Sequence, residues 1–191
     1  MRISKYTVIY DACVLYPAPL RDLLLTLASS GLFRARWTND IHDEWMRNLI
    51  KNRPDLDESR LARTKQLMNR AVLDCLVEGY QDLIPSLHLP DENDRHVLAA
   101  AIKCAADGII TFNRRDFPAV EVDTYEIEVQ HPDDFLLAQF DLDEAAVINA
   151  IHTCRKRLKK PEKTGEEYLD TLEQQSLPKF VNALRPWTAI I

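Results

Sequence analysis

The sequence predicts an α/β/α sandwich with a central parallel sheet, followed by a helical C-terminal extension. Candidate strands alternate with candidate helices in the first part of the chain, an order typical of a parallel sheet covered by helices. The strand candidates around Ile9 and Ile110 are continuously apolar, as parallel strands buried on both faces should be. From Asp141 onward the pattern becomes helical. We therefore expect a domain over residues 1–140 and a helical extension over residues 141–191.

The first half of the chain begins with strand formers at residues 7–10, which end at Asp11. Pro19 can open the apolar helix that follows, and Gly31 can cap it in a left-handed conformation. Pro54 ends a later helix. The elements expected here are a helix at 20–29, a short strand at 33–37, a helix from Thr38 or Asn39 to about residue 51, and a helix at 57–76.

The second half contains a further helix–strand unit and then a series of helices. Pro90 and Asp91 start an alanine-rich helix, and Gly108 separates it from the next strand. Alternating apolar residues predict one more strand before the helical part begins. The expected elements are a helix at 92–106, strands at 109–112 and 125–129, and helices at 132–140, 145–158, 166–175 and 179–184.

Charge and cysteine content limit the possible classes of protein. The net charge is −6, whereas a general nucleic-acid binder would be basic. Residues 1–140 hold the surplus, with 22 Asp and Glu against 16 Lys and Arg, and residues 141–191 are balanced. These surplus acidic residues either form a solvated surface or surround a bound cation. The four cysteines have no zinc-like spacing and are typical of reduced thiols in a cytoplasmic protein, and no apolar run is long enough for a membrane span.

Four carboxylates are candidates for a shared site, although each has an ordinary explanation when taken alone: Asp11, Glu44, Asp94 and Asp116. Asp11 could start a turn, Asp116 could cap one, and Glu44 could be solvated on its helix. Asp91 is a good helix N-cap, with Asp94 three residues later in an imperfect capping box. Taken singly, these structural explanations are the better ones.

Their positions along the predicted sheet favour a common site. Ligands of open parallel sheets bind beyond the carboxyl ends of the strands. Asp11 ends the first strand, Asp116 follows the strand that contains Ile110, and Asp94 lies in the helix that leads to it. If the two strands are neighbours, the acids repel one another unless a hard cation such as Mg²⁺ or Mn²⁺ is bound. Such a site is typical of phosphodiester hydrolysis.

Four segments resemble, in order, the motifs of PIN-domain ribonucleases, of the kind found as VapC-like toxins in type II toxin–antitoxin pairs: residues 8–15, 37–44, 89–101 and 109–118. The third and fourth segments in tandem are the specific ones. The resemblance covers roughly residues 6–140. The long linker between the second and third motifs does not align, and the C-terminal extension resembles one seen in some relatives.

The resemblance implies a metal-dependent endoribonuclease whose catalytic and metal-binding residues are Asp11, Glu44, Asp94 and Asp116. It adds a set of supporting polar residues: Thr38, Asp91, Thr111 and Asn113. The assignments of Asp91 against Asp94, and of Asn113 against Asp116, stay open. The resemblance also implies Mg²⁺ or Mn²⁺ as cofactor, RNA as substrate, a small cognate antitoxin as partner, and a homodimer.

Two other functions and two other features are open at this stage. The fold could serve RNA processing outside a toxin–antitoxin system, or the acidic pocket could capture a basic partner without catalysis. His96 is expected to pack or bond locally. A basic cluster in the extension could contact RNA phosphates or form a solvated helix end: Arg155, Lys156, Lys159 and Lys160.

Overall fold

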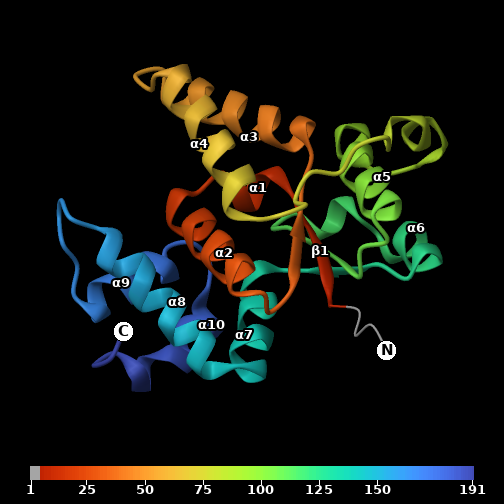
Figure 1. Cartoon of the computed structure of the whole chain (residues 1–191). Helices are drawn as coiled ribbons and strands as arrows, with labels where there is room; N and C mark the ends of the chain where they lie inside the picture. Colours follow the sequence, from red (N-terminus) through yellow and green to blue (C-terminus); the bar gives the residue numbers. More distant parts are fainter. Residues whose placement is uncertain (1–4) are drawn as a thin grey trace. The chain divides into compact units, whose positions relative to one another are not determined.

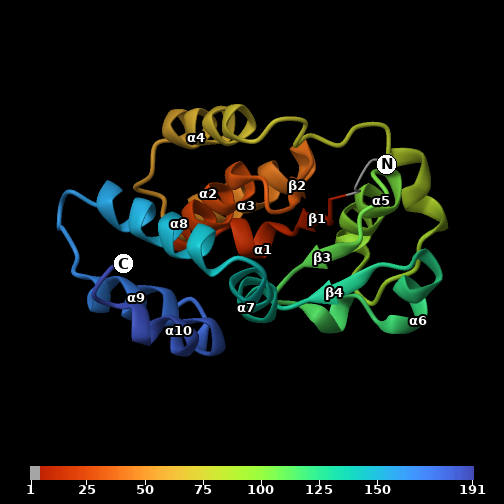
Figure 2. The same cartoon turned by 60° about the horizontal axis from the view of Figure 1, so that its bottom comes forward.

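The computed structural model describes residues 5–191, in which four strands form one parallel sheet in the order β2-β1-β3-β4. The strands are β1 (Thr7–Tyr10), β2 (Arg34–Arg36), β3 (Gly108–Ile110) and β4 (Glu128–Gln130). Figure 2 shows β1, β3 and β4 side by side. Ile9 lies opposite Ile109 in the central pair. The predicted parallel sheet and the adjacency of its two central strands are confirmed; residues 1–4 of the expected domain lie outside the described residues.

The two central strands are buried on both faces. Val8, Ile9 and Tyr10 have no exposed surface, and neither have Ile109 and Ile110. Helix α5 (Arg95–Lys103) packs against both β1 and β3 with its alanine-rich face. Small side chains on that face allow a close approach of the helix to the sheet.

The remaining elements around the sheet are α1 (Ala12–Leu15), α3 (Asn39–Asn52), α4 (Glu58–Ala71), η1 (Gln81–Ser86), η2 (Glu92–Asp94), η3 (Arg114–Asp116), α6 (Ala119–Val122) and η4 (Asp123–Tyr125). Helices α3 and α4 pack side by side, as Figure 1 shows. Thr38 caps α3 by accepting a hydrogen bond from the backbone N–H of Ile41 at 3.0 Å. The predicted start of α3 is therefore correct.

The bounds of three predicted elements differ most from those in the structure. The helix expected at 57–76 ends at Ala71, because the chain then becomes extended and Leu76 forms a parallel bridge with Trp37. The helix expected at 92–106 begins with the single turn η2 and ends at Lys103. The strand expected at 125–129 starts only at Glu128, because the preceding residues form η4 and a left-handed turn. The short helices α1 and α6 were not predicted.

The chain divides into two compact units, residues 1–16 with 33–131 and residues 17–32 with 132–191. The second unit contains α2 (Ala18–Ser30), α7 (Pro132–Leu142), α8 (Glu144–Arg157), α9 (Gly165–Glu173), α10 (Pro178–Leu184) and η5 (Arg185–Trp187). The division differs from the boundary expected between residues 140 and 141, which would cut α7. A second difference from the expected domains is that α2, which lies within residues 1–140, packs on α8 and α9 and belongs to the unit of the C-terminal helices.

A buried carboxylate joins two helices of the second unit. Asp133, at the start of α7, is 3% exposed and accepts the backbone N–H groups of Lys179 at 3.0 Å and Phe180 at 2.8 Å. These donors lie in the first turn of α10, where backbone N–H groups have no partner within the helix. Across residues 5–191, no helix is both long and apolar enough to cross a membrane.

We predict that Asp133→Ala lowers the free energy of unfolding by about 1–3 kcal/mol, because two backbone N–H donors, of which that of Phe180 is buried, lose their acceptor. The adjacent Asp134 is partly exposed and pairs with the exposed Lys179 side chain at 2.6 Å, so Asp134→Ala should cost no more than about 0.5 kcal/mol. Urea denaturation gives both values, and amide exchange at Lys179 and Phe180 should accelerate only in the first variant. Equal losses in the two variants would contradict this role of Asp133.

Candidate active site

The site begins at the carboxyl ends of the two central strands. The backbone N–H of Asp11 continues the sheet by donating to the carbonyl oxygen of Ile110 at 3.1 Å. This pairing brings Thr111 beside Asp11, and the Thr111 hydroxyl donates to Asp11 Oδ2 at 2.6 Å. Both side chains are buried, with 2% of Asp11 and 0% of Thr111 exposed. The strand register thus fixes the orientation of this carboxylate.

Cys13 gives Asp11 a second hydrogen-bond donor. Its Sγ lies 3.0 Å from Asp11 Oδ2, and it accepts the backbone N–H of Phe112 at 3.3 Å. Burial raises the pKa of the Cys13 thiol, and the nearby Asp11 carboxylate raises it further, so the thiol keeps its proton. Burial likewise raises the pKa of Asp11, while the hydrogen bonds from Thr111 and Cys13 lower it. The two donors therefore favour the ionised carboxylate against the cost of burial.

Asp94 lies at the start of α5 and is 8% exposed. Its pKa is raised to about 7, mainly by burial and then by four nearby carboxylates: Asp11, Asp91, Asp116 and Glu44. Like charges have this effect only at short range. The structure therefore places Asp94 among the other acids singled out in the sequence. The Asp91 side chain turns to its own loop, where it accepts the backbone N–H of Asn93 at 2.9 Å and caps η2.

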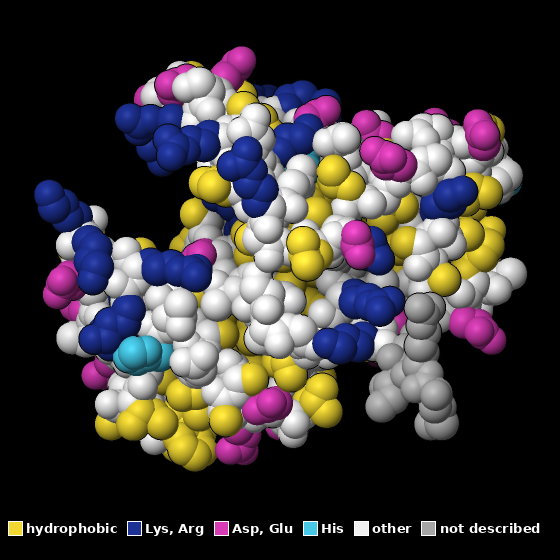
Figure 3. Space-filling view, in the orientation of Figure 1, with side chains coloured by type: hydrophobic (Ala, Val, Ile, Leu, Met, Phe, Trp, Pro, Cys, Tyr) yellow, Lys and Arg dark blue, Asp and Glu magenta, His cyan; other side chains and the backbone are white. Residues whose placement is uncertain are grey.

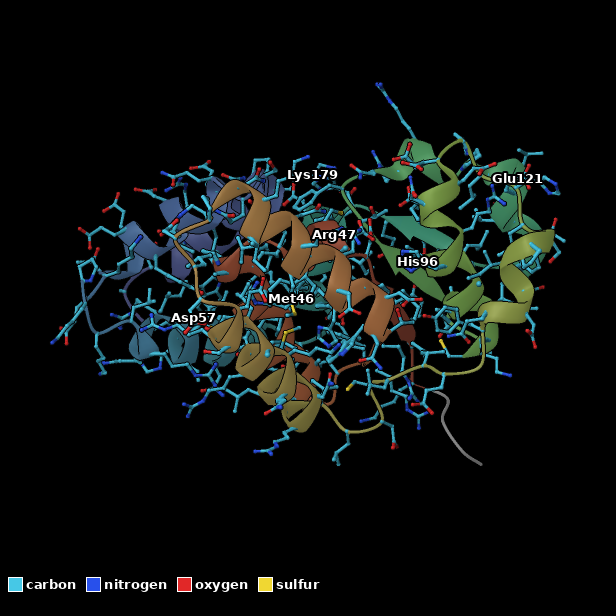
Figure 4. The ribbon with its side chains drawn as sticks, turned by 90° about the horizontal axis from the view of Figure 1, so that it is seen from above. Met46, Arg47, Asp57, His96, Glu121 and Lys179 are labelled. Carbon is cyan, nitrogen blue, oxygen red and sulfur yellow. The ribbon has the colours of Figure 1, made fainter. Side chains whose placement is uncertain are left out.

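Glu44 reaches the site from α3 and contacts His96, which the sequence analysis expected to pack or bond only locally. His96 Nε2 lies 3.2 Å from Glu44 Oε2, and both side chains are largely shielded from solvent. His96, labelled in Figure 4, lies in the first turn of α5, which begins directly after Asp94. Its other ring nitrogen, Nδ1, is buried and has no hydrogen-bond partner among residues 5–191. An unpaired N–H would be costly there, so the neutral ring carries its proton on Nε2 and donates it to Glu44.

The structure gives the other sequence candidates different surroundings. Asp116 ends η3 and is partly buried, whereas Asn113 before it is exposed and does not cap η3. The backbone N–H of Asn113 donates to the Thr111 hydroxyl at 2.9 Å, which orients that hydroxyl toward Asp11. Thr38 is fully buried and uses its side chain to cap α3. Thr38 thus stabilises the start of the helix that carries Glu44.

The chemistry of these donors fits a hard divalent cation. Carboxylate oxygens are the ligands that Mg²⁺ and Mn²⁺ prefer, and a cation would relieve the repulsion that nearby carboxylates add to the effect of burial on the pKa of Asp94. The side chains do not close around one point: across residues 5–191, no group of three or more His, Cys, Asp or Glu is arranged to hold a metal ion. The residues therefore fit a divalent metal in the chemistry of their oxygen donors.

The basic cluster of the second unit has both internal and exposed members. Arg155 donates to the carbonyl oxygen of Lys163 at 2.8 Å, and Arg157 pairs with Asp22 at 2.9 Å. The exposed lysines of the cluster are Lys156, Lys159 and Lys160. Figure 3 shows Lys and Arg side chains gathered near the loop between α8 and α9. Arg155 thus has a structural contact, and the three lysines carry the exposed charge.

A parallel sheet with carboxylates gathered at the ends of its central strands defines an α/β protein with an acidic site suited to divalent cations. Residues 7–115 match the PIN domain family, and residues 132–186 match the family described as the VapC50 C-terminal domain. The chain therefore belongs to the PIN-domain family. The PIN match contains Asp11, Glu44 and Asp94 and ends one residue before Asp116.

A curated relative gives a second comparison. The chain is 40% identical over 107 residues to a Mycobacterium tuberculosis (strain ATCC 25618 / H37Rv) protein named "Putative ribonuclease VapC50". The aligned part is 56% of this chain and 62% of the length of that relative. No solved structure matches the chain. The relative shares the family, and its name bears on function only through the proposal made below.

We predict that Asp94→Asn stabilises the protein in EDTA at pH 7, because it removes one of several mutually repelling charges. The Asp94 pKa is raised above its ordinary value of 3.8, so the folded protein holds a proton there that the unfolded chain releases. Wild-type stability should consequently fall as the pH rises from about 4 to about 7, and Asp94→Asn should reduce this fall. Melting temperatures measured across this range test it, at about 2–4 °C per kcal/mol.

Asp82→Asn is the matched control for this prediction. Asp82 is an exposed aspartate on η1, and its substitution should leave the melting temperature within about 2 °C at every pH. A melting temperature of Asp94→Asn below that of the wild type at pH 7 would show that the acids do not repel one another as described.

Proposed function

We propose that this chain is a Mg²⁺- or Mn²⁺-dependent endoribonuclease and the toxin of a VapBC-type toxin–antitoxin pair. The observation that carries the proposal is the gathering of three carboxylates from separate segments close to Asp94: those of Asp11, Asp116 and Glu44. A protein gains no stability from such repulsion. Its presence in a PIN-domain chain supports a site kept for chemistry.

In this mechanism the metal would be held by Asp11, Glu44, Asp94 and Asp116, directly or through water. A bound divalent cation would polarise the scissile phosphate and stabilise the leaving oxygen. Thr111 and Cys13 hold Asp11 in one orientation through bonds of 2.6 and 3.0 Å. His96 holds the Glu44 carboxylate in the same way from α5. Because these neighbours are neutral donors, they orient the acids without competing for the place of a cation.

The proposal extends to partners and location. The match to the VapC50 C-terminal domain family and the relative named as a VapC protein support a small antitoxin partner. A homodimer and a cytoplasmic location are part of the same proposal. An open reading frame beside the gene that encodes a small antitoxin-like protein would support the toxin role. A chain that cuts RNA but arrests no growth when expressed would instead favour RNA processing.

We predict that the purified protein cuts single-stranded RNA with Mg²⁺ or Mn²⁺ and that EDTA stops the reaction. Asp11→Asn keeps the shape of the side chain and removes its charge, so cleavage should fall by at least about 100-fold, a loss of about 2.7 kcal/mol in the barrier. Gel analysis of a labelled RNA gives the rates, and variants purified in parallel reveal any contaminating nuclease.

Glu44→Gln and Asp43→Asn make a matched pair for the same assay. Glu44 contacts His96, whereas the neighbouring Asp43 is exposed and pairs with Lys65 at 3.0 Å. Only Glu44→Gln should lose activity. Full activity in EDTA would overturn the metal mechanism, and RNA binding without cleavage in any metal would favour a non-catalytic acidic pocket.

We predict that His96→Leu weakens Mn²⁺ binding and cleavage by about tenfold to 100-fold, because Glu44 loses the donor that orients it. His96→Gln should restore most of the loss, since its side-chain amide can donate from nearly the position of Nε2. Calorimetry measures Mn²⁺ affinity and thermal melting measures stability. If both variants lost Mn²⁺ affinity and cleavage equally, and in proportion to their loss of thermal stability, His96 would be only a packing residue.

A further inference from the structure

A cavity lies next to the carboxylate site, and one continuous segment of the chain forms it. Its volume is about 670 Å³, which is in the range of pockets that hold small ligands. The segment runs from the loop after β3 through η3, α6 and η4 to the end of β4. Figure 2 labels β3, α6 and β4. We call it the 112–131 cavity. Its lining residues include Phe112, Arg114, Arg115, Asp116, Asp123 and His131.

The cavity shares a wall with the candidate active site. Asn113 and Asp116 line it, and Asp116 is one of the acids that raise the pKa of Asp94. The loop that begins the cavity is fixed to the site as well, because the backbone N–H of Phe112 donates to Cys13 Sγ at 3.3 Å. A chain-like substrate with its phosphate at the carboxylates would therefore extend into this cavity.

The lining combines surfaces suited to the parts of a nucleotide. Phe112 and His131 form an edge-to-face pair with ring centroids 5.2 Å apart, and both rings contribute to the lining. Val122 and Ile127 add buried apolar surface. Aromatic rings stack with nucleobases of any sequence. This part of the lining would accept a base, and its apolar surface would exclude water from the contact.

The polar lining matches the rest of a nucleotide. Arg114 and Arg115 lie exposed on η3 and carry guanidinium groups, which bind phosphate with two parallel hydrogen bonds. Asp123 and Glu128 line the same cavity, and a carboxylate accepts hydrogen bonds from the amino groups of bases. Ligands with only negative charge would be repelled by these acids. A nucleotide offers both the phosphate and the donors that the lining requires.

We propose that the 112–131 cavity is a subsite that binds one nucleotide of single-stranded RNA adjacent to the scissile phosphate. The inference rests on the proposed ribonuclease function. Phe112 stacks with the base, His131, whose ring is turned 70° from that of Phe112, contacts the base edge-on, and Arg115 contacts a flanking phosphate. The basic η3 segment thereby supplies phosphate contacts that the carboxylates themselves cannot make.

The test measures RNA binding separately from cleavage. All variants carry Asp11→Asn, and fluorescence anisotropy with Mg²⁺ reports the binding of a labelled five-nucleotide RNA. Phe112→Leu should weaken binding by about fivefold to 100-fold, the range expected for one stacked base, and Phe112→Tyr should restore it. Arg115→Gln should reduce the dependence of log affinity on log salt by about 0.7. Arg63→Gln, an exposed arginine on α4, is the matched control and should change neither.

The outcomes distinguish this proposal from the ribonuclease proposal. Cleavage by the wild type, with binding unchanged by Phe112→Leu and Arg115→Gln, would overturn the subsite alone. Binding that depends on the cavity, in a wild type that cuts no RNA, would support the subsite and remove the nuclease. A parent variant that binds no RNA would overturn the subsite. Displacement of the RNA by an acidic peptide but not by 5′-AMP or 5′-CMP would assign the cavity to a protein partner instead.

Discussion

The parallel pairing of β1 with β3 is the constraint on which the site depends. It continues past the strands, where the Asp11 N–H donates to Ile110, and it brings the Thr111 hydroxyl to 2.6 Å from the Asp11 carboxylate. Because side chains alternate across a strand, a shift of one residue would turn Thr111 away from Asp11. The complete burial of both strands makes such a shift costly. Packing of the sheet thus secures the geometry of its acidic edge.

The electrostatics of the site follow from what surrounds the acids. Asp11 is held by a hydroxyl and a thiol, and Glu44 by a neutral imidazole. These donors orient the carboxylates and leave their repulsion in place, which adds to the effect of burial in raising the pKa of Asp94. A lysine or arginine within the cluster would relieve the repulsion permanently. Neutral donors instead leave it to be relieved by a bound cation, which is the basis of the functional proposal.

The second unit is assembled from two separate stretches of the chain. Helix α2 lies early in the sequence but packs against α8 and α9, and Asp133 joins α7 to the start of α10. The C-terminal helices therefore pack with a helix that precedes three of the four strands in the sequence. Removing residues 132–191 would take away the partners of α2, so the C-terminal unit is not a simple appendage to the PIN domain.

The sequence by itself determined the local features: the apolar strands, Thr38 and Gly31 as helix caps, and the motif order that identifies a PIN domain. These depend on residues close together in the chain, where periodicity and capping act directly. Only the tertiary structure decided that α2 joins the C-terminal helices and that His96 donates to Glu44, 52 residues away. It also decided where α4 and β4 begin and end, because long-range pairing overrides local preference there. No local pattern encodes which distant residues share a contact.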